Sequence, residues 1–294
     1  MPDPIPPPRQ SGFTTTTKVP LYWARYGPAD APKLIVLHGG PGAHHDYLLP
    51  QMLHLAERYD VIFYDQRGGG RSRSDDREPV GWRTNVADLA AAVREFNLDP
   101  LSIVGYSWGG LLAVLYALEA ADDGSLPAPS RLVLIDPAPL ARKYRQQFEA
   151  EFARRQQGPA IQRMRDELAQ SGLRDSDPDA WRQANFELGV AGYFVHPENA
   201  RNLTPFRVIG RIQQSVWESL GDYDLIPRLG KIGCPALVVH GRDDPIPVES
   251  SIESARAMNA RLVLLDDCGH VPYVEQPARL FSAVDVFLAE SDPQ

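Results

Sequence analysis

The stretch LSIVGYSWGG, residues 101–110, decides the fold. Its apolar run predicts a buried strand over Leu101–Tyr106, and we expect a helix to start near Leu111. Ser107 falls on the sharp turn between them, where the backbone is held in a strained conformation that costs about 1–3 kcal/mol. The residues two before and two after it must be small, and both are glycine. This strand–turn–helix context predicts a nucleophile at Ser107 rather than a structural glycine turn.

Short apolar runs of the same kind recur on both sides of this stretch. They alternate with longer helical patterns, which predicts an α/β fold with a mostly parallel sheet and helices on both faces. The further strands are expected at Leu34–His38, Asp60–Tyr64, Arg131–Asp136, Ala236–His240 and Arg261–Leu265. Thr14–Arg25 predicts an antiparallel hairpin at the edge of the sheet. The last helix is expected to begin near Pro277 and to bury one face, formed by Leu280, Val284, Phe287 and Leu288.

Between Pro137 and about Pro227 this alternation stops. Roughly 90 residues contain no convincing strand, and an aromatic residue recurs every fourth position at Tyr144, Phe148 and Phe152, which indicates helices. A helical block inserted between two strands is expected above the C-terminal edge of the sheet, where open α/β folds bind ligands. The sequence therefore predicts a core of residues 1–137 and 228–294 and a helical cap domain of residues 138–227.

Composition excludes several classes of protein. The 294 residues are 43% hydrophobic, ample for a buried core, and carry a formal net charge of −8. That charge argues against nucleic acid or an anionic membrane surface as a partner. Cys234 and Cys268 are too few for a disulfide framework, and no apolar run approaches the ~18 residues of a membrane helix. Met1–Pro8 has neither a basic nor an apolar run, so we expect no signal peptide and a cytoplasmic protein; the oligomeric state is left open.

A serine hydroxyl is a poor nucleophile unless a base takes its proton. In a sheet of this kind, the acid and the histidine follow the serine in chain order, each on a loop after a later strand. His270 follows the last strand and is the predicted base, and Asp244 is the predicted acid. Asp243 and Asp136 are the alternatives for the acid. Because the base must be neutral, we expect activity to fall in acid with an apparent pKa of about 6–7.

Acyl transfer also requires hydrogen-bond donors for the developing oxyanion. The glycine-rich run His38–Gly42 follows a strand, and glycine lets backbone N–H groups approach a substrate closely. We predict that the N–H groups of Gly40 and Trp108 form an oxyanion hole, with Gly39 close to the substrate; loss of one donor typically costs about 2.7–4 kcal/mol. The alternative is a tight glycine turn needed only for packing. Asp65 and Arg67 are expected to brace this loop.

Five motifs together resemble the proline iminopeptidase family, a branch of the capped α/β hydrolases. They are His38–Gly42, Asp65–Ser72, Ser107–Gly110, Gly241–Asp244 and Gly269-His270. The resemblance covers nearly all of the sheet-forming region and is weak across the cap. It implies an α/β-hydrolase fold, a triad of Ser107, Asp244 and His270, an oxyanion hole at Gly40 and Trp108, and no cofactor. The activity implied is removal of an N-terminal residue, often proline, from a peptide or amide.

The cap departs from this family's pattern. Aminopeptidases of the family use cap glutamates to hold the substrate's free amine, one of them a few residues before an aromatic pair. Here the pair is Tyr193-Phe194, the position three before it is Val190, and the nearest acid is Glu187. An ammonium buried without a carboxylate partner is costly, so Glu187 is hypothesised as the amine anchor, against an ordinary exposed glutamate. Four aromatic residues are expected either to line an apolar pocket or to pack within the cap, namely Trp181, Phe186, Phe194 and Trp217.

Other functions remain as alternatives. The missing cap acid favours a carboxylesterase or amidase acting on small esters or amides, and a non-catalytic ligand receptor on the same scaffold is the remote rival. In every case the expected ligand is a small molecule or a short peptide. His44-His45-Asp46 could suggest a metal, yet no further ligands have suitable spacing, so no metal is predicted.

Overall fold

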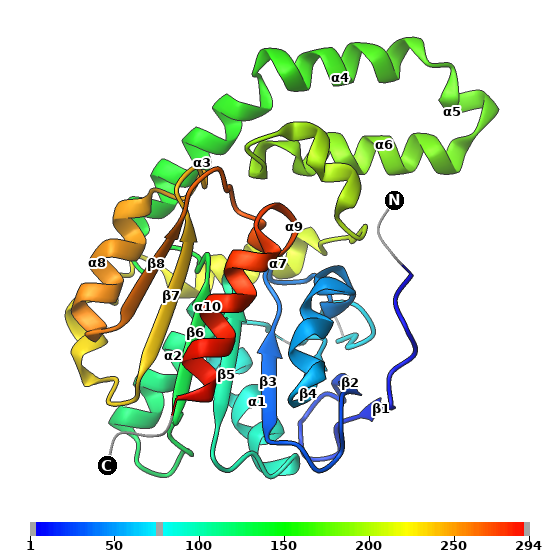
Figure 1. Cartoon of the computed structure of the whole chain (residues 1–294). Helices are drawn as coiled ribbons and strands as arrows, with labels where there is room; N and C mark the ends of the chain where they lie inside the picture. Colours follow the sequence, from blue (N-terminus) through cyan, green and yellow to red (C-terminus); the bar gives the residue numbers. More distant parts are fainter. Residues whose placement is uncertain (1–3, 75–78, 291–294) are drawn as a thin grey trace.

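The computed structural model describes residues 4–74 and 79–290, so part of the segment Met1–Pro8, for which no signal peptide is expected, lies outside the described residues. The described residues form one eight-stranded sheet in the order β1-β2-β4-β3-β5-β6-β7-β8 (Figure 1). β1 (Gln10–Phe13) and β2 (Tyr22–Tyr26) are antiparallel to their neighbours, and the other strands run parallel. These are β3 (Lys33–Leu37), β4 (Asp60–Tyr64), β5 (Ser102–Tyr106), β6 (Arg131–Ile135), β7 (Ala236–Gly241) and β8 (Arg261–Leu265). The predicted mostly parallel sheet is confirmed, each parallel strand within one residue of its expected bounds.

The edge hairpin lies earlier in the chain than predicted. Thr14–Arg25 was expected to contain both strands, but β1 ends at Phe13, and most of the expected first arm is the connecting loop. The N–H of Thr14 donates to the carbonyl of Leu21 at 2.9 Å and closes this loop. The sequence signal was absent because β1 reads QSGF and lies at an exposed sheet edge, which needs no alternation of apolar residues.

Alternate residues of each parallel strand point to opposite faces of the sheet, and helices cover both faces as predicted. Ile103 packs into the core beneath α1 (Trp82–Glu95), α2 (Trp108–Asp122) and α8 (Val248–Met258). The next residue, Val104, packs into the second core beneath α10 (Pro277–Ala289) and the 3₁₀ helix η2 (Gln51–Glu57). The last helix begins at Pro277 as expected, whereas α2 begins directly after Ser107 rather than near Leu111.

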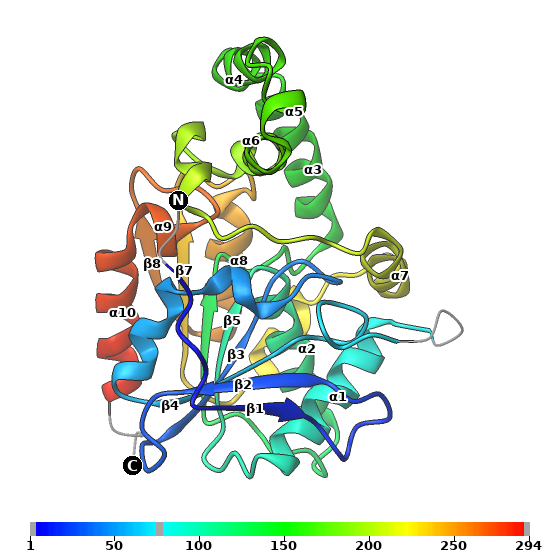
Figure 2. The same cartoon turned by 90° about the vertical axis from the view of Figure 1, so that its right-hand side faces the viewer.

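Between β6 and β7 the described chain is helical. The elements are α3 (Arg142–Gln156), α4 (Pro159–Gln170), α5 (Leu173–Ser176), α6 (Pro178–Val190), η3 (Ala191–Tyr193), η4 (Pro197–Asn202), α7 (Gly210–Leu220) and η5 (Ile226–Lys231). Figures 1 and 2 show α3 to α6 projecting from the end of the sheet to which the parallel strands point. α7 differs from them, because its Ile212 and Val216 are buried in the core that α1 and α2 form.

Candidate active site

Ser107 lies on the turn between β5 and α2, with φ of 53° and ψ of −119°. A non-glycine residue in this conformation is strained, at a cost of about 1–3 kcal/mol. The turn is tight enough to require the flanking glycines. A Cβ on Gly105 would lie 2.5 Å from the carbonyl oxygen of Gly109, and a Cβ on Gly109 would lie 2.1 Å from that of Leu37. The chain therefore turns sharply at Ser107 and presents its hydroxyl at the edge of the sheet.

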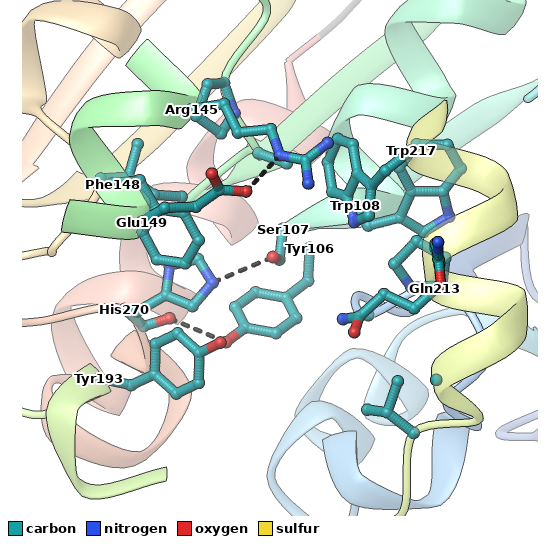
Figure 3. Close-up of a pocket in the computed structure, with 18 of the residues that line it drawn as sticks. Tyr106, Ser107, Trp108, Arg145, Phe148, Glu149, Tyr193, Gln213, Trp217 and His270 are labelled. Carbon is teal, nitrogen blue, oxygen red and sulfur yellow. Dashed lines mark hydrogen bonds and ion pairs between the residues drawn. The ribbon is translucent and has the colours of Figure 1, made fainter. Parts of the chain in front are cut away.

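The structure brings Ser107, His270 and Asp244 together in a hydrogen-bonded row. The Oγ of Ser107 lies 3.0 Å from the Nε2 of His270 (Figure 3). The Nδ1 of His270 lies 2.7 Å from one carboxylate oxygen of Asp244, and the other oxygen accepts the N–H of Ile246 at 2.7 Å. Since Asp244 accepts the Nδ1–H, Nε2 is free to accept the serine proton. The alternative acid Asp243 is exposed and does not contact His270.

Burial decides the protonation state of this histidine. His270 is almost fully buried beneath the rings of Tyr106 and Tyr193. Burial lowers the pKa of His270 to about 4, and the nearby carboxyl groups of Asp136 and Glu275 act in the opposite direction. The imidazole must be neutral to act as a base. It therefore stays neutral down to a lower pH than the apparent pKa of about 6–7 expected from the sequence.

The predicted oxyanion donors lie beside the serine. Gly40 has φ of 58°, in the left-handed region that favours glycine. Within the described residues the backbone N–H groups of Gly40 and Trp108 have no acceptor, so both are available to a substrate. The N–H of Gly39 donates instead to the hydroxyl of Tyr47 at 2.7 Å. Gly39 is required for close approach, because a Cβ there would lie 2.8 Å from the Cβ of Ser107.

Gln66, which sequence reasoning passed over, holds this loop in place. Its N–H donates to the Nε2 of His38 at 3.0 Å, and its side-chain amide donates to the carbonyl of His38 at 2.8 Å. Its Oε1 accepts the indole N–H of Trp108 at 2.7 Å, which links the two segments that supply the oxyanion donors. The two residues expected to brace this loop make their contacts outside it. Arg67 pairs with Asp88 on α1, and Asp65 contacts His45 at 2.6 Å. The signals for Gln66 were its position between the two residues singled out and its place in the motif Asp65–Ser72.

A cavity of about 920 Å³ lies over the serine. Gly40, Trp108, Tyr193, Trp217 and His270 line it among the residues predicted for the site. Its cap-side wall is formed by α3 and α7, which contribute Arg145, Phe148, Glu149 and Gln213 (Figure 3). This volume is well above that of a single proline side chain and fits the ~300–1,000 Å³ typical of small-molecule sites.

Three residues predicted for substrate binding do not line this cavity. Glu187 accepts a hydrogen bond from Gln183 at 2.8 Å along α6, away from the cavity lining. Phe194 is 3% exposed and packs in the core, and Gly39, whose N–H donates to the hydroxyl of Tyr47, is not among the lining residues. Packing also accounts for Phe186, which meets Phe206 edge to face. In this structure Glu187 therefore does not reach the cavity, and its role as an amine anchor stays a prediction.

An acidic residue that does line the cavity lies on α3 instead. This residue, Glu149, directly follows Phe148 in the aromatic stripe that indicated the helix. Its carboxylate accepts the Nε–H of Arg145 at 2.9 Å, and the guanidinium of Arg145 lies 3.9 Å over the ring of Trp217. Trp217 in turn packs edge to face on Trp108. Glu149 is therefore a carboxylate whose charge is already compensated.

Glu275 was also missed, and it fixes the loop that carries the histidine. This residue ends α9 (Pro272–Glu275), and its carboxylate accepts the N–H groups of Gly269 at 2.7 Å and Val195 at 2.9 Å. The N–H of His270 also donates to the carbonyl of Tyr193 at 2.8 Å. The histidine loop is thereby joined to the segment after η3, and no local sequence pattern indicated this link.

A family model described as alpha/beta hydrolase fold matches residues 32–277. The chain belongs to the alpha/beta hydrolase family. Over 281 residues it is 28% identical to a proline iminopeptidase of Lactobacillus delbrueckii subsp. lactis, and the match covers 90% of this chain and 92% of the relative. It is also 28% identical over 273 residues to a proline iminopeptidase of Heyndrickxia coagulans, covering 87% and 90%. A solved structure of a proline iminopeptidase-related protein from Thermus thermophilus matches with a TM-score of 0.72 and 20% identity, over 95% of this chain and 97% of that one.

This alpha/beta hydrolase is thus an enzyme of the hydrolase class that is similar to proline iminopeptidases. The expected fold and the expected resemblance are both confirmed. The family model spans both sheet halves and the helical insertion between them, so the similarity is not confined to the motif around the serine.

Proposed function

We propose that this alpha/beta hydrolase is a serine hydrolase in which Ser107 is the nucleophile, His270 the base and Asp244 the acid. The observation that carries the proposal is the row of hydrogen bonds that joins the three side chains, at 3.0 Å and 2.7 Å, at the floor of the cavity. Residues 138–227 act as a cap that supplies the opposite wall. No metal or other cofactor takes part in this chemistry.

The reaction follows from the positions of these atoms. The Oγ of Ser107 attacks the substrate carbonyl carbon while the Nε2 of His270 takes the hydroxyl proton. The oxyanion accepts the N–H groups of Gly40 and Trp108, and each donor contributes about 2.7–4 kcal/mol to transition-state stabilisation. His270 then gives its proton to the leaving amine or alcohol. A water molecule, deprotonated by His270, hydrolyses the acyl-enzyme and frees Ser107.

For the substrate, we propose a small peptide or amide from which the enzyme releases the N-terminal residue. The support is the similarity to relatives named proline iminopeptidase over about nine-tenths of the chain. A cavity of about 920 Å³ has room for a residue larger than proline together with part of its leaving group. Tyr193 and Trp217 provide apolar walls for the acyl side.

One observation favours a second candidate, a carboxylesterase or amidase acting on substrates without a free amine. Glu187 lies outside the cavity lining, and Glu149 within it is already paired with Arg145. The other lining carboxylate, Glu218, is exposed and accepts a hydrogen bond from Gln214. An ammonium group entering the cavity must therefore compete with Arg145 for Glu149, or with the amide of Gln214 for Glu218.

Turnover of proline-β-naphthylamide and p-nitrophenyl acetate by the wild type and Ser107→Ala separates these possibilities. The proposal predicts hydrolysis of the arylamide by the wild type and loss of about 10³-fold or more in Ser107→Ala. Ester turnover without arylamide turnover would reject the peptidase and support the carboxylesterase. Unchanged turnover in Ser107→Ala would reject the serine mechanism itself.

We further propose that the enzyme works in the cytoplasm, which agrees with the free thiols of Cys234 and Cys268. Within the described residues, no helix combines the length and apolar character needed to cross a membrane.

A further inference from the structure

Asp136 is a buried carboxyl group behind the proposed triad, and the mechanism above does not use it. It directly follows β6, is fully buried and has φ of 39° although it is not glycine. Its Oδ1 accepts the N–H of Gly241 at 2.8 Å. Its Oδ2 is buried and accepts no hydrogen bond from any donor among the described residues. A buried polar atom without a partner is rare in folded proteins and calls for a physical reason.

The carboxyl group of Asp244 lies near enough to Asp136 to be considered as the partner of Oδ2. A carboxyl oxygen of Asp136 lies within 4.8 Å of one of Asp244, and both side chains are buried away from water. An ionised carboxylate only accepts hydrogen bonds, so a hydrogen bond between two carboxyl groups requires a proton on one of them. Two ionised carboxylates at this distance would also repel each other strongly, because little solvent screens them.

The contacts of the two groups decide which one carries that proton. Asp244 accepts the N–H of Ile246 and the Nδ1–H of His270, which stabilise its ionised form. Asp136 accepts only the N–H of Gly241 among the described residues. We propose that Asp136 is a neutral positioning residue whose carboxylic O–H donates to the carboxylate of Asp244 and holds it against His270. This inference rests on the proposed roles of Asp244 and His270.

The groups that surround Asp136 are consistent with a neutral acid. Burial and the charge of Asp244 raise the pKa of Asp136 well above its ordinary value, against the opposing effect of His270. Burial lowers the pKa of His240, on β7, to about 4 and so keeps that ring neutral. Burial also raises the pKa values of three further groups from β5, the last loop and α9 that interact with Asp136, namely Tyr106, Cys268 and Tyr273.

Asp136, His240 and Asp244 also offer donor atoms within 4.8 Å of one another, a spacing that a metal ion could use. The other contacts of these three residues favour a proton, rather than a metal ion, between Asp136 and Asp244. Both ring nitrogens of His240 are engaged, with the hydroxyl of Ser251 at 2.9 Å and the carbonyl of Ile246 at 3.1 Å. One oxygen of Asp244 already accepts from His270. Only the unpartnered Oδ2 of Asp136 needs a new contact, and one proton supplies it.

Two substitutions at Asp136 test the proposal. Asp136→Asn keeps the shape, the acceptor for Gly241 and an N–H donor toward Asp244, whereas Asp136→Ala removes all three. We expect kcat/KM of Asp136→Asn to stay within about threefold of the wild type, and that of Asp136→Ala to fall about tenfold to a hundredfold, the usual consequence of deleting a buried hydrogen-bond partner. The acid limb of the pH profile should coincide in Asp136→Asn and the wild type, because one neutral group replaces another. Asp243→Asn, on the exposed neighbour, is the matched control and should change neither quantity.

Three other results would contradict the proposal that Asp136 is neutral. If Asp136 works in its ionised form, Asp136→Asn removes a negative charge near His270 and moves the acid limb to lower pH. That shift, or a loss in Asp136→Asn equal to that in Asp136→Ala, would overturn the proposal. Loss of activity on dialysis against EDTA, restored by a divalent cation, would assign the cluster to a metal instead.

Infrared spectroscopy on the wild type provides a test that does not depend on the variants folding. Spectra of protein with and without ¹³C-labelled aspartate should show, at neutral pH, the C=O band of a buried protonated carboxyl group that shifts with the label. Absence of that band would refute a neutral Asp136. Ser107→Ala separates this inference from the function it rests on: if that variant is inactive and Asp136→Asn shifts the pH profile, only the present proposal fails.

Discussion

The chemistry proposed at Ser107 depends on a backbone conformation that few residue types support. The φ of 53° at this residue orients the hydroxyl toward His270, and the turn is tight enough that neither flanking glycine has room for a Cβ. His270 is positioned from both sides, because its Nδ1 contacts Asp244 and its carbonyl accepts the hydroxyl of Tyr106 at 2.9 Å. The reactive atoms are thus held before a substrate enters, which limits the reorganisation that catalysis requires.

The pH dependence of the reaction tests this arrangement at the level of one residue. A base must be neutral, so kcat/KM falls as pH decreases through the pKa of the free enzyme's histidine. Burial places the pKa of His270 below the ordinary value of 6.5. We therefore expect kcat/KM to stay constant from pH 8 down to below 6.5 and to decline only at lower pH. A midpoint above 6.5, measured with a substrate that does not titrate in this range, would contradict the account.

Some of these residues were predictable from sequence and others were not. Ser107 and His270 follow strands at positions that the fold reserves for a nucleophile and a base, so order along the chain was enough to predict that the two side chains meet. Gln66 and Glu275 act through hydrogen bonds to backbone atoms of distant segments. Such contacts depend on how the loops pack in three dimensions, and no periodicity or spacing in the chain encodes them.

At the scale of elements, short links between loops set the geometry of the site. Glu275 on α9 accepts two backbone N–H groups, one from the histidine loop and one from the segment after η3. We expect Glu275→Ala to lower kcat about tenfold with a smaller change in KM, because hydrogen bonds to a charged group are worth about 1.5–3 kcal/mol each and hold the base rather than the substrate. Steady-state kinetics on the arylamide or the ester measures both constants.

The control for this variant is Glu249→Ala, at a glutamate in the first turn of α8 that lies outside the cavity lining. Its kinetic constants should match those of the wild type. A rise in KM at unchanged kcat in Glu275→Ala would show that Glu275 shapes the substrate site and not the position of His270.

The elements themselves were predictable to different degrees. The parallel strands are apolar along most of their length, since both faces of the sheet are covered, and they stood out from the sequence. β1 is a short exposed edge strand without such a pattern, and its position was missed. In the cap, the helices were predictable, but which side of each helix faces the cavity was not. No residue of α3 is buried, so the aromatic stripe did not reveal whether Glu149 or Glu187 lines the cavity.

At the scale of the whole molecule, one buried ion pair joins the sheet to a covering helix. Arg67, after β4, donates to both carboxylate oxygens of Asp88 on α1, and each side chain is only 5% exposed. Removing one partner leaves an uncompensated buried charge, so we expect Arg67→Ala to reduce the free energy of unfolding by about 3–5 kcal/mol. Urea unfolding followed by circular dichroism measures the change.

Arg154→Ala serves as the matched control for this loss of stability. Arg154 pairs with Glu151 on the exposed surface of α3, where such pairs contribute about 0–1 kcal/mol. Equal losses in the two variants would mean that the Arg67–Asp88 pair has no special role in holding α1 to the sheet.

Covalent labelling of the whole folded protein tests the central claim most directly. A fluorophosphonate reacts with a serine hydroxyl only where a base activates it, and mass spectrometry of the digested protein locates the adduct. We predict one adduct per chain, on Ser107, with labelling lost in Ser107→Ala and strongly slowed in a His270→Ala variant. An unlabelled folded protein, or an adduct on a different serine, would contradict the account.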